Sequence, residues 1–194
     1  MTVRWLVRAC ALLVGAASLA ACDLGGDLQG IAVDPPREMP TFAFTRADGS
    51  TVTTSADPGR PMVLFFGYTH CPDVCPTTLA DWKRVRVRLG DEAQAVRFVF
   101  VTIDPARDTP TVAERYARMY DASFEGLSGD ASTTSRMMDA FGVAAARDPG
   151  TNATGYLVSH SSQVFLVDSH GKLVALYPFG SGWDALAADL ERLL

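Results

Sequence analysis

The sequence has no apolar run long enough to cross a membrane, no excess of basic residues and no internal repeat. A membrane-spanning helix needs about 20 predominantly apolar residues. The chain carries 17 Lys and Arg against 22 Asp and Glu, a formal net charge of −5. This balance argues against a nucleic-acid partner and against a basic patch for anionic lipids. With 194 residues and no sign of a second domain, we expect one domain with a sizeable core.

The first residues have the composition of a targeting segment. Arg4 and Arg8 are followed by an apolar run of mostly small residues at 9–21. The run is too short to span a bilayer, and a positive start before a short apolar stretch is typical of a secretory signal peptide. Residues 1–21 are therefore expected to be removed from the mature protein.

The end of this segment indicates lipid attachment. Residues 19–22, Leu-Ala-Ala-Cys, resemble a bacterial lipobox. This implies cleavage before Cys22 and lipidation of Cys22, with ordinary cleavage or an uncleaved anchor as the alternatives. Several acyl chains on one residue would hold the protein stably on a membrane. Asp23 then resembles a signal for retention at the inner membrane, so the expected location is the periplasmic side of the bacterial inner membrane.

Glycine and proline are frequent over residues 22–40, which predicts a flexible tether between the lipid and a domain at residues 41–194. Within that domain, strand-like runs alternate with helical periodicity. The predicted elements are a hairpin of 42–45 with 51–54, a strand 62–66, a helix 76–89, a strand 96–103, helices 109–120 and 132–141, a hairpin of 163–167 with 173–177, and a helix 184–194. This order predicts an α/β, thioredoxin-like fold with an N-terminal β-hairpin extension.

Two cysteines at the start of a predicted helix are the most distinctive chemical feature. Cys71 and Cys75 follow the strand at 62–66, lie four residues apart and are each followed by proline. Residues four apart share one face of a helical turn, so the sulfurs could close a disulfide or hold one soft metal ion. The helix N-terminus favours thiolates, which are both nucleophiles and metal ligands. A structural disulfide or a pair of inert thiols is the alternative.

The other cysteines are expected to be absent from the folded domain. Cys10 would leave with the signal peptide and Cys22 would carry lipid, which leaves Cys71 and Cys75. In an exported, oxidising compartment a nearby thiol pair tends to become a disulfide. Metal binding by this pair would therefore need a reductant.

Three segments together resemble the signatures of a known family. They are GYTHCPDVCP at residues 67–76, VTIDPARDTP at residues 101–110 and HSS at residues 160–162. Their sequence, order and spacing are similar to those of the SCO/SenC family. Members of that family are thioredoxin-fold, membrane-tethered copper proteins that help assemble the dinuclear copper centre of cytochrome c oxidase. They deliver copper, reduce the cysteines of that centre, or both.

The resemblance implies that Cys71, Cys75 and His160 are copper ligands. Two thiolates and one imidazole suit Cu(I) in a three-coordinate site and can admit Cu(II) with a further ligand. A structural zinc site would need a fourth protein ligand. On its own, a single loop histidine is a weaker indication of a metal ligand. Family members often carry Asp directly before this histidine, whereas this chain has Ser159, which leaves the role of an acidic neighbour open.

The resemblance implies a metallochaperone with three kinds of partner. These are the copper-centre subunit of cytochrome c oxidase, another periplasmic copper donor or thiol reductant, and the membrane that holds the lipid. The alternative function is a thiol–disulfide oxidoreductase that reduces partner cysteines through a mixed disulfide with Cys71 or Cys75. The two functions differ at His160, whose loss should weaken copper retention and leave thiol exchange largely intact. Whether the chain is an enzyme depends on which role dominates.

Two further residues are candidates for supporting roles. Asp104 ends a predicted strand near the expected thiol site, so it could tune the metal, meet a partner or cap the turn at Pro105. His70 adjoins Cys71, and adjacent side chains point apart on a helix or strand, so we interpret it as supporting the ligands or the fold. The segment Asp-Thr-Pro at residues 108–110 predicts an N-cap for the helix that follows.

Overall fold

The computed structural model describes residues 28–55, 57, 59–150 and 155–194. The predicted signal peptide at residues 1–21 and the predicted lipid attachment at Cys22 lie outside these described residues and stay predictions. None of the helices in the described part is both long enough and apolar enough to cross a membrane.

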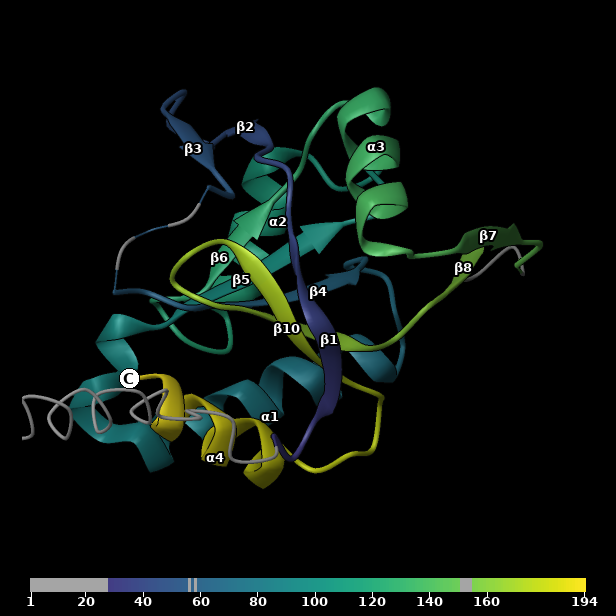
Figure 1. Ribbon diagram of the computed structural model, residues 1–194. Helices are drawn as coiled ribbons and strands as arrows, with labels where there is room; N and C mark the ends of the chain where they lie inside the picture. The colour runs from purple at the N-terminus through teal and green to yellow at the C-terminus, as the bar shows by residue number, and fades with distance from the viewer. Residues whose placement is uncertain (1–27, 56, 58, 151–154) are drawn as a thin grey trace, which may run out of the picture.

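A mixed β-sheet with helices on both faces forms the centre of the domain (Figure 1). In chain order the elements are β1 Ile31–Glu38, β2 Ala43–Thr45, β3 Thr51–Thr53, β4 Met62–Gly67, α1 Val74–Leu89, η1 Gly90–Ala95, β5 Arg97–Thr102, α2 Pro110–Arg118, β6 Glu125–Leu127, α3 Ala131–Phe141, β7 Ala145–Asp148, β8 Leu157–His160, β9 Val164–Val167, β10 Lys172–Tyr177 and α4 Trp183–Leu193.

The main sheet has six strands in the order β1-β10-β9-β4-β5-β6. β4 pairs in parallel with β5 and antiparallel with β9, so it occupies the middle of the sheet. Both β4 and β5 are buried along their whole length, which explains why each is a nearly continuous apolar run rather than an alternating pattern. Because β4 and β5 are parallel, their carboxyl ends meet at one edge, and the turn into α1 starts there.

Successive residues of β4 point to opposite faces of the sheet. Val63 and Phe65 join a hydrophobic cluster with residues of α1, α2 and α4. Leu64 and Phe66 join a second cluster with α3 and the β2–β3 hairpin. The sheet therefore separates two apolar layers, and β4 is held from both sides.

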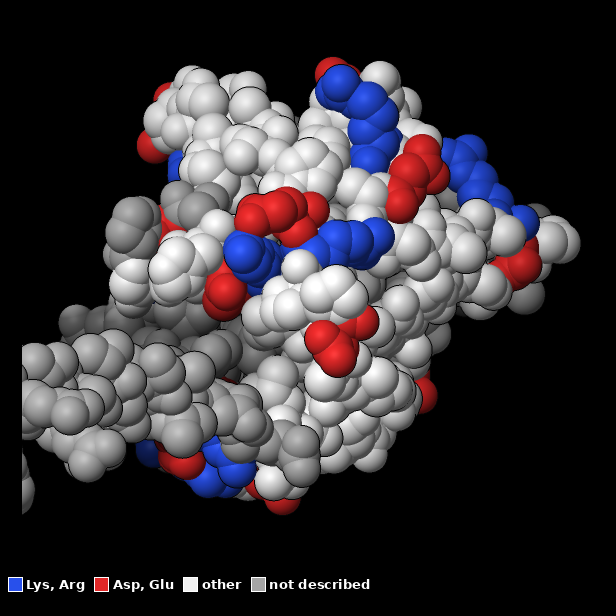
Figure 2. Space-filling view, viewed as in Figure 1, with Lys and Arg blue, Asp and Glu red and all other residues white. Residues whose placement is uncertain are grey.

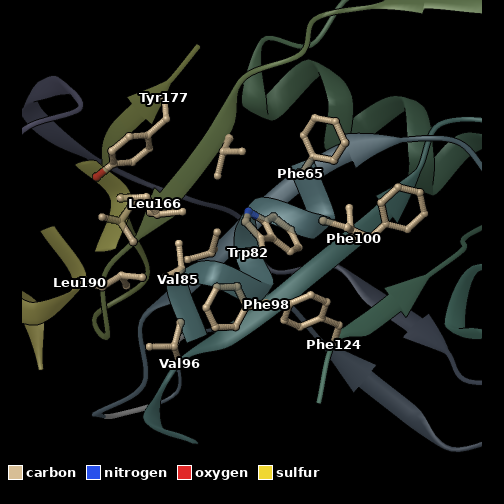
Figure 3. Close-up of a cluster of buried hydrophobic side chains, with 14 of the residues drawn as sticks. Phe65, Trp82, Val85, Val96, Phe98, Phe100, Phe124, Leu166, Tyr177 and Leu190 are labelled. Carbon is tan, nitrogen blue, oxygen red and sulfur yellow. The ribbon is translucent and has the colours of Figure 1, made fainter. Parts of the chain in front are cut away.

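Trp82 lies in the first of these layers and fixes α1 on the sheet (Figure 3). Its ring centroid lies 5.6 Å from the rings of both Phe98 and Phe124 and 6.4 Å from that of Phe65. Aromatic pairs at such separations add to the stabilisation from buried area. The apolar face of α1 is thus packed tightly, and the first turn of the same helix carries Cys75.

The predicted α/β, thioredoxin-like fold is confirmed, including the β2–β3 hairpin and the strands and helices of the central unit. α1 begins at Val74, two residues earlier than predicted. α2 has Thr109 as its N-cap, and the Thr109 hydroxyl accepts a hydrogen bond from the Val112 amide. Asp130 caps α3 in the same way, and Gly142 ends α3 in the left-handed conformation.

The prediction of a flexible tether over residues 22–40 is wrong for residues 31–38, which form β1 at the edge of the main sheet. Pro35 and Pro36 lie within the interruption of register between Ala32 and Arg37. Prolines are compatible with an edge strand, where fewer amides must donate to a neighbour. Glycine and proline content alone therefore could not distinguish a tether from this strand.

Two strand features were not predicted. β6 has three residues and includes a glycine, so it is too short for a period-two pattern. β7 and β8 form a separate hairpin that extends from the body of the domain beside α3 (Figure 1). β7, Ala-Ala-Arg-Asp, has no β-branched or aromatic residue, so local sequence gave no indication of this strand.

Acidic and basic side chains lie next to one another on the face that contains β1 (Figure 2). One ion pair joins Lys172 to Glu38 at 3.4 Å across β10 and β1. Another joins Arg46 to Glu125 at 2.6 Å. The Lys172–Glu38 pair is exposed, and pairs of this kind contribute about 0–1 kcal/mol. The two hydrophobic layers therefore stabilise the fold more than such exposed charges do.

Candidate metal centre

The turn between β4 and α1 brings the two predicted thiols together. The Cys71 amide donates to the carbonyl of Tyr68 at 3.2 Å, which closes the turn. Cys75 lies in the first turn of α1 and is fully buried, whereas Cys71 is half-buried. The Cys75 amide donates to the Cys71 sulfur at 3.5 Å. Both thiols are free.

The last residue of β4 must be a glycine, Gly67, because the Cys75 thiol packs closely against it. A Cβ atom at this position would lie 2.7 Å from the Cys75 sulfur and 2.8 Å from the Phe100 ring. Such separations are shorter than van der Waals contact, so any larger residue would displace the sulfur. The glycine that precedes the cysteine motif thus lets Cys75 pack against the strand.

His160, the last residue of β8, also lies close to the two thiols. Its Nδ1 donates to the carbonyl of Ser161 at 2.8 Å, which leaves the lone pair on Nε2 free for a metal. Nε2 lies 3.9 Å from the Cys75 sulfur. The rings of Phe65 and Tyr68, each 6.0 Å away in an edge-on arrangement, confine the imidazole. The imidazole of His160 is therefore both close to the thiols and held in a fixed orientation.

The ligand atoms of Cys71, Cys75 and His160 all lie within 4.8 Å of one another. Three donors that each lie about 2.0–2.3 Å from one ion are separated by about 4 Å, so small movements suffice to place a metal between them. Two sulfurs and one nitrogen suit a soft ion such as Cu(I). The chemistry of the donor set therefore fits the copper site that the sequence predicted.

The two thiols differ in acidity. A hydrogen bond from the Cys75 thiol lowers the pKa of Cys71 to about 3. The same hydrogen bond, together with burial, raises the pKa of Cys75. At neutral pH the pair thus keeps one proton, on Cys75, and presents a thiolate at Cys71. Binding of a metal by both sulfurs would release that proton.

Asp108 is a buried residue whose role the sequence did not reveal. Its carboxylate accepts hydrogen bonds from the Thr69 amide at 2.9 Å, the Thr69 hydroxyl at 2.6 Å and the Thr102 hydroxyl at 2.6 Å. It therefore holds the turn before Cys71 against the end of β5. The predicted N-cap segment at residues 108–110 is confirmed, with Thr109 as the N-cap. The partner, Thr69, is 39 residues away in sequence, so no local signal identified it.

His70 does not belong to the Cys71–Cys75–His160 group. Its ring is about half exposed, and Nδ1 lies 3.7 Å from the Asp108 carboxylate and 3.2 Å from the Thr69 hydroxyl. The side chain thus points to the turn that precedes the thiols rather than to the sulfurs. A supporting role for His70 stays a prediction.

Asp104 also lies outside the group of ligand atoms. Its backbone carbonyl closes the turn before α2 by accepting from the amides of Arg107 and Asp108. Its side chain is 2% exposed and accepts hydrogen bonds from the Tyr156 hydroxyl and from Arg107. The carboxylate is therefore directed to the segment that leads into β8.

The serine that precedes His160 has an acidic partner of its own. The Ser159 hydroxyl donates to the carboxylate of Asp148 on the neighbouring strand β7. Ser159 is paired with Ala146, and Asp148 with Leu157, in the β7–β8 ladder. The Asp148 carboxylate therefore lies beside β8, the strand that carries His160, although it does not come from the position directly before the histidine.

Comparison with known proteins gives a consistent result. The family model SCO1/SenC matches residues 32–194. A relative from Stutzerimonas stutzeri, whose name describes it as copper-binding, is 38% identical over 142 residues, which is 71% of this chain and 69% of that protein. The chain spans about two thirds of the length of the curated relatives that it matches, 69% and 64% for two of them.

Solved structures show the same similarity in three dimensions. The solution structure of apo Sco1 from Thermus thermophilus has a TM-score of 0.75 and 36% identity, and the match covers 87% of this chain and 98% of that one. The structure of Bradyrhizobium japonicum ScoI with copper bound has a TM-score of 0.73 and 35% identity, covering 81% and 99%. With its thioredoxin-like fold and its thiol–imidazole group at the expected positions, the chain belongs to the SCO1/SenC family.

Proposed function

We propose that the chain is a metallochaperone that binds copper through Cys71, Cys75 and His160. The observation that carries this proposal is the convergence of two sulfurs and one imidazole nitrogen within 4.8 Å. Soft thiolate donors favour copper over hard cations. The Bradyrhizobium japonicum relative has copper bound according to its description, which supports the same cargo here.

Transfer of copper would proceed by ligand exchange. A site with three protein ligands leaves room for an incoming thiolate to join before an existing ligand leaves. Cys71 is the more exposed of the two sulfurs, whereas Cys75 is fully buried. A thiolate from a partner would therefore approach on the Cys71 side, and the buried Cys75 would be the last ligand to leave.

The proposed recipient is the copper-centre subunit of cytochrome c oxidase, which membership of the SCO/SenC family implies. A periplasmic copper donor or a thiol reductant would prepare the site, because an oxidised pair cannot bind the metal. A lipid on Cys22 would place the domain at the periplasmic side of the inner membrane, near such a membrane-bound recipient.

The decisive test is an anaerobic copper titration of the reduced protein, residues 23–194, against its His160→Ala variant. We expect one tightly held copper per wild-type chain. The affinity of the variant should fall by at least about 100-fold, because losing a ligand costs more than the roughly 10–100-fold typical of an outer-shell partner. Competition with a chelator of known copper affinity measures the difference.

His170→Ala is the matched control. His170 lies in the turn between β9 and β10, and its side chain is 81% exposed, so copper affinity should not change. If wild type and His160→Ala held copper equally well, or if neither held it tightly, the proposal would be wrong.

A second function is favoured by one specific observation, the lowered pKa of the half-exposed Cys71. A thiolate that partner proteins can reach is suited to attack a disulfide, with the buried Cys75 then resolving the mixed disulfide. In that exchange the partner is reduced and the Cys71–Cys75 pair is oxidised. The reduction potential of the pair, together with unchanged thiol exchange in His160→Ala, would distinguish a reductase from a copper carrier.

A further inference from the structure

The β7–β8 hairpin carries a proposed metal ligand but is itself poorly buried. It extends from the body of the domain (Figure 1), and most residues of β7 are exposed. Within the described residues, it pairs with no strand of the main sheet. Val158 is the buried residue of β8. Val158 packs in the first hydrophobic cluster, and polar contacts to the loop after β5 add to this attachment.

Tyr156, directly before β8, supplies one of these polar contacts. Its hydroxyl donates to the Asp104 carboxylate, 2.7 Å from one oxygen and 2.8 Å from the other. Asp104 is 2% exposed, and a hydrogen bond to a buried charge is stronger than one in water. The two residues are 52 positions apart in sequence, so this bond joins the hairpin to the loop after β5.

Arg107, in the same loop as Asp104, makes two further contacts with Tyr156 and one with Asp104. Its Nε donates to the Asp104 carboxylate, and its Nη1 donates to the Tyr156 carbonyl at 2.9 Å. Its guanidinium carbon lies 3.6 Å from the centroid of the Tyr156 ring, within cation–π range. Arg147 of β7 adds a second guanidinium, 4.6 Å from that centroid and 3.8 Å from Asp104. We call Asp104, Arg107, Arg147 and Tyr156 the Tyr156 cluster.

The Tyr156 cluster is linked to the thiol side as well. Asp104 follows Ile103, whose amide donates to the carbonyl of Gly67 at 2.8 Å. Gly67 lies next to the Cys75 sulfur, since a Cβ atom at this position would be only 2.7 Å from it. One end of the cluster is therefore fixed beside Cys75, and the other end holds the segment that leads to His160.

We propose that the Tyr156 cluster positions His160 over the thiols, so that Asp104, Arg107 and Tyr156 act as positioning residues for the metal centre. The inference rests on the proposed role of His160 as a ligand. Without the cluster, the hairpin keeps its own ladder but opens from the domain more often, and Nε2 of His160 spends less time near the sulfurs. Copper affinity would then fall although no ligand is lost.

The first test uses metal-free protein and hydrogen exchange of the backbone amides. Tyr156→Phe removes only the hydroxyl and keeps the ring on Arg107. We expect exchange of the β7–β8 amides to be about tenfold faster, as for loss of one hydrogen bond to a carboxylate, and exchange in β9 to be unchanged. Unchanged exchange in the hairpin would overturn the inference.

Tyr177→Phe is the matched control for this experiment. The Tyr177 hydroxyl donates to the buried Asp189 carboxylate at 2.6 Å, which is the same kind of hydrogen bond. Tyr177 belongs to the first hydrophobic cluster, and Figure 3 shows its ring near Leu166. This variant should destabilise the domain without selective opening of the β7–β8 hairpin. Equal effects of both variants on the hairpin would contradict a specific role of Tyr156.

The second test is a double-mutant cycle for copper affinity. Tyr156→Phe should weaken copper binding roughly tenfold to 100-fold when His160 is present, as outer-shell partners do. It should have no further effect in a His160→Ala background, because the cluster acts through that side chain. An equal loss in both backgrounds would show a general structural effect and overturn the inference.

The two tests separate failure of the inference from failure of the proposed function. If His160→Ala bound copper as tightly as wild type, His160 would not be a ligand, and the proposed function would be wrong in that respect. The exchange experiment on metal-free protein would still decide whether Tyr156 holds the hairpin. If Tyr156→Phe left hairpin exchange unchanged while His160→Ala lost copper, only the positioning inference would be wrong.

Discussion

The two halves of the candidate metal centre are built differently. Cys75 lies at the start of a 16-residue helix that packs on the central sheet, and its side chain is fully buried. His160 lies at the end of a two-stranded hairpin that pairs with no other strand of the described residues. Cys75 is therefore part of the hydrophobic core, whereas the hairpin that carries His160 is attached to the core largely by polar contacts.

This difference suggests a division of roles within the site. Side chains that belong to a packed core stay in place because movement would cost buried area. A hairpin held by a few hydrogen bonds and a stacked arginine opens at a lower cost. A carrier that must both hold and release an ion can use a fixed pair of sulfurs and a third ligand that moves. The predictions below test whether the two halves differ in this way.

The largest effect is expected on the thiol side, from Trp82→Ala. Trp82, a residue of α1, is buried against three aromatic rings of the core. Truncation of a buried tryptophan typically costs about 3–5 kcal/mol of unfolding free energy, because apolar contacts are lost and a cavity remains. Urea denaturation followed by circular dichroism measures the change.

Val87→Ala on the opposite face of the same helix is the control, since Val87 is 77% exposed. Its effect should stay within about 0.5 kcal/mol. A Trp82→Ala variant that lost no more stability than Val87→Ala would show that the core does not hold the thiol side. If Trp82→Ala did not fold, Trp82→Phe would give a smaller loss in the same direction.

The thiol half is also the half that the sequence predicted well. The apolar run before Gly67, the spacing of Cys71 and Cys75 and the helical periodicity after them are all local patterns. Local patterns determine a strand, a turn and an amphipathic helix, so the strand–turn–helix unit followed directly. Gly67 was part of the recognised motif, but its steric reason, the proximity of the Cys75 sulfur, needed the three-dimensional structure.

The histidine half was predicted mainly through family resemblance, because a single loop histidine is by itself a weaker indication of a metal ligand. The residues that place His160, namely Tyr156 and Asp104, lie in different segments, and neither belongs to a periodic pattern. Asp108 was likewise noted only as part of an N-cap segment, because its partner, Thr69, is distant in sequence. Buried polar contacts between loops leave no periodic signal in the sequence, so the β7–β8 hairpin and its attachments could not be derived from it.

A smaller loss is expected from Gly67→Ala, which tests how tightly the sulfur is packed. The new Cβ would lie 2.7 Å from the Cys75 sulfur, so the sulfur or the strand must shift. Overpacking of this kind costs about 1–3 kcal/mol, and copper affinity should fall because one ligand is displaced. Gly129→Ala is the control, since its nearest contact would be 3.2 Å, with Phe44. Equal copper affinity in wild type and Gly67→Ala would show that the thiol side adjusts more easily than we infer.

The smallest effect is expected in the hairpin itself, from Ser159→Ala. Ser159 is exposed, and its hydroxyl bonds to the carboxylate of Asp148 within the same hairpin. Loss of this bond should change the unfolding free energy by no more than about 0.5 kcal/mol, because water can replace the partner. Copper affinity should change by less than about threefold, since the bond neither contacts the ligand atoms nor joins the hairpin to the core. A loss comparable to that of His160→Ala would mean that the neighbour of the histidine, rather than the Tyr156 cluster, controls the ligand.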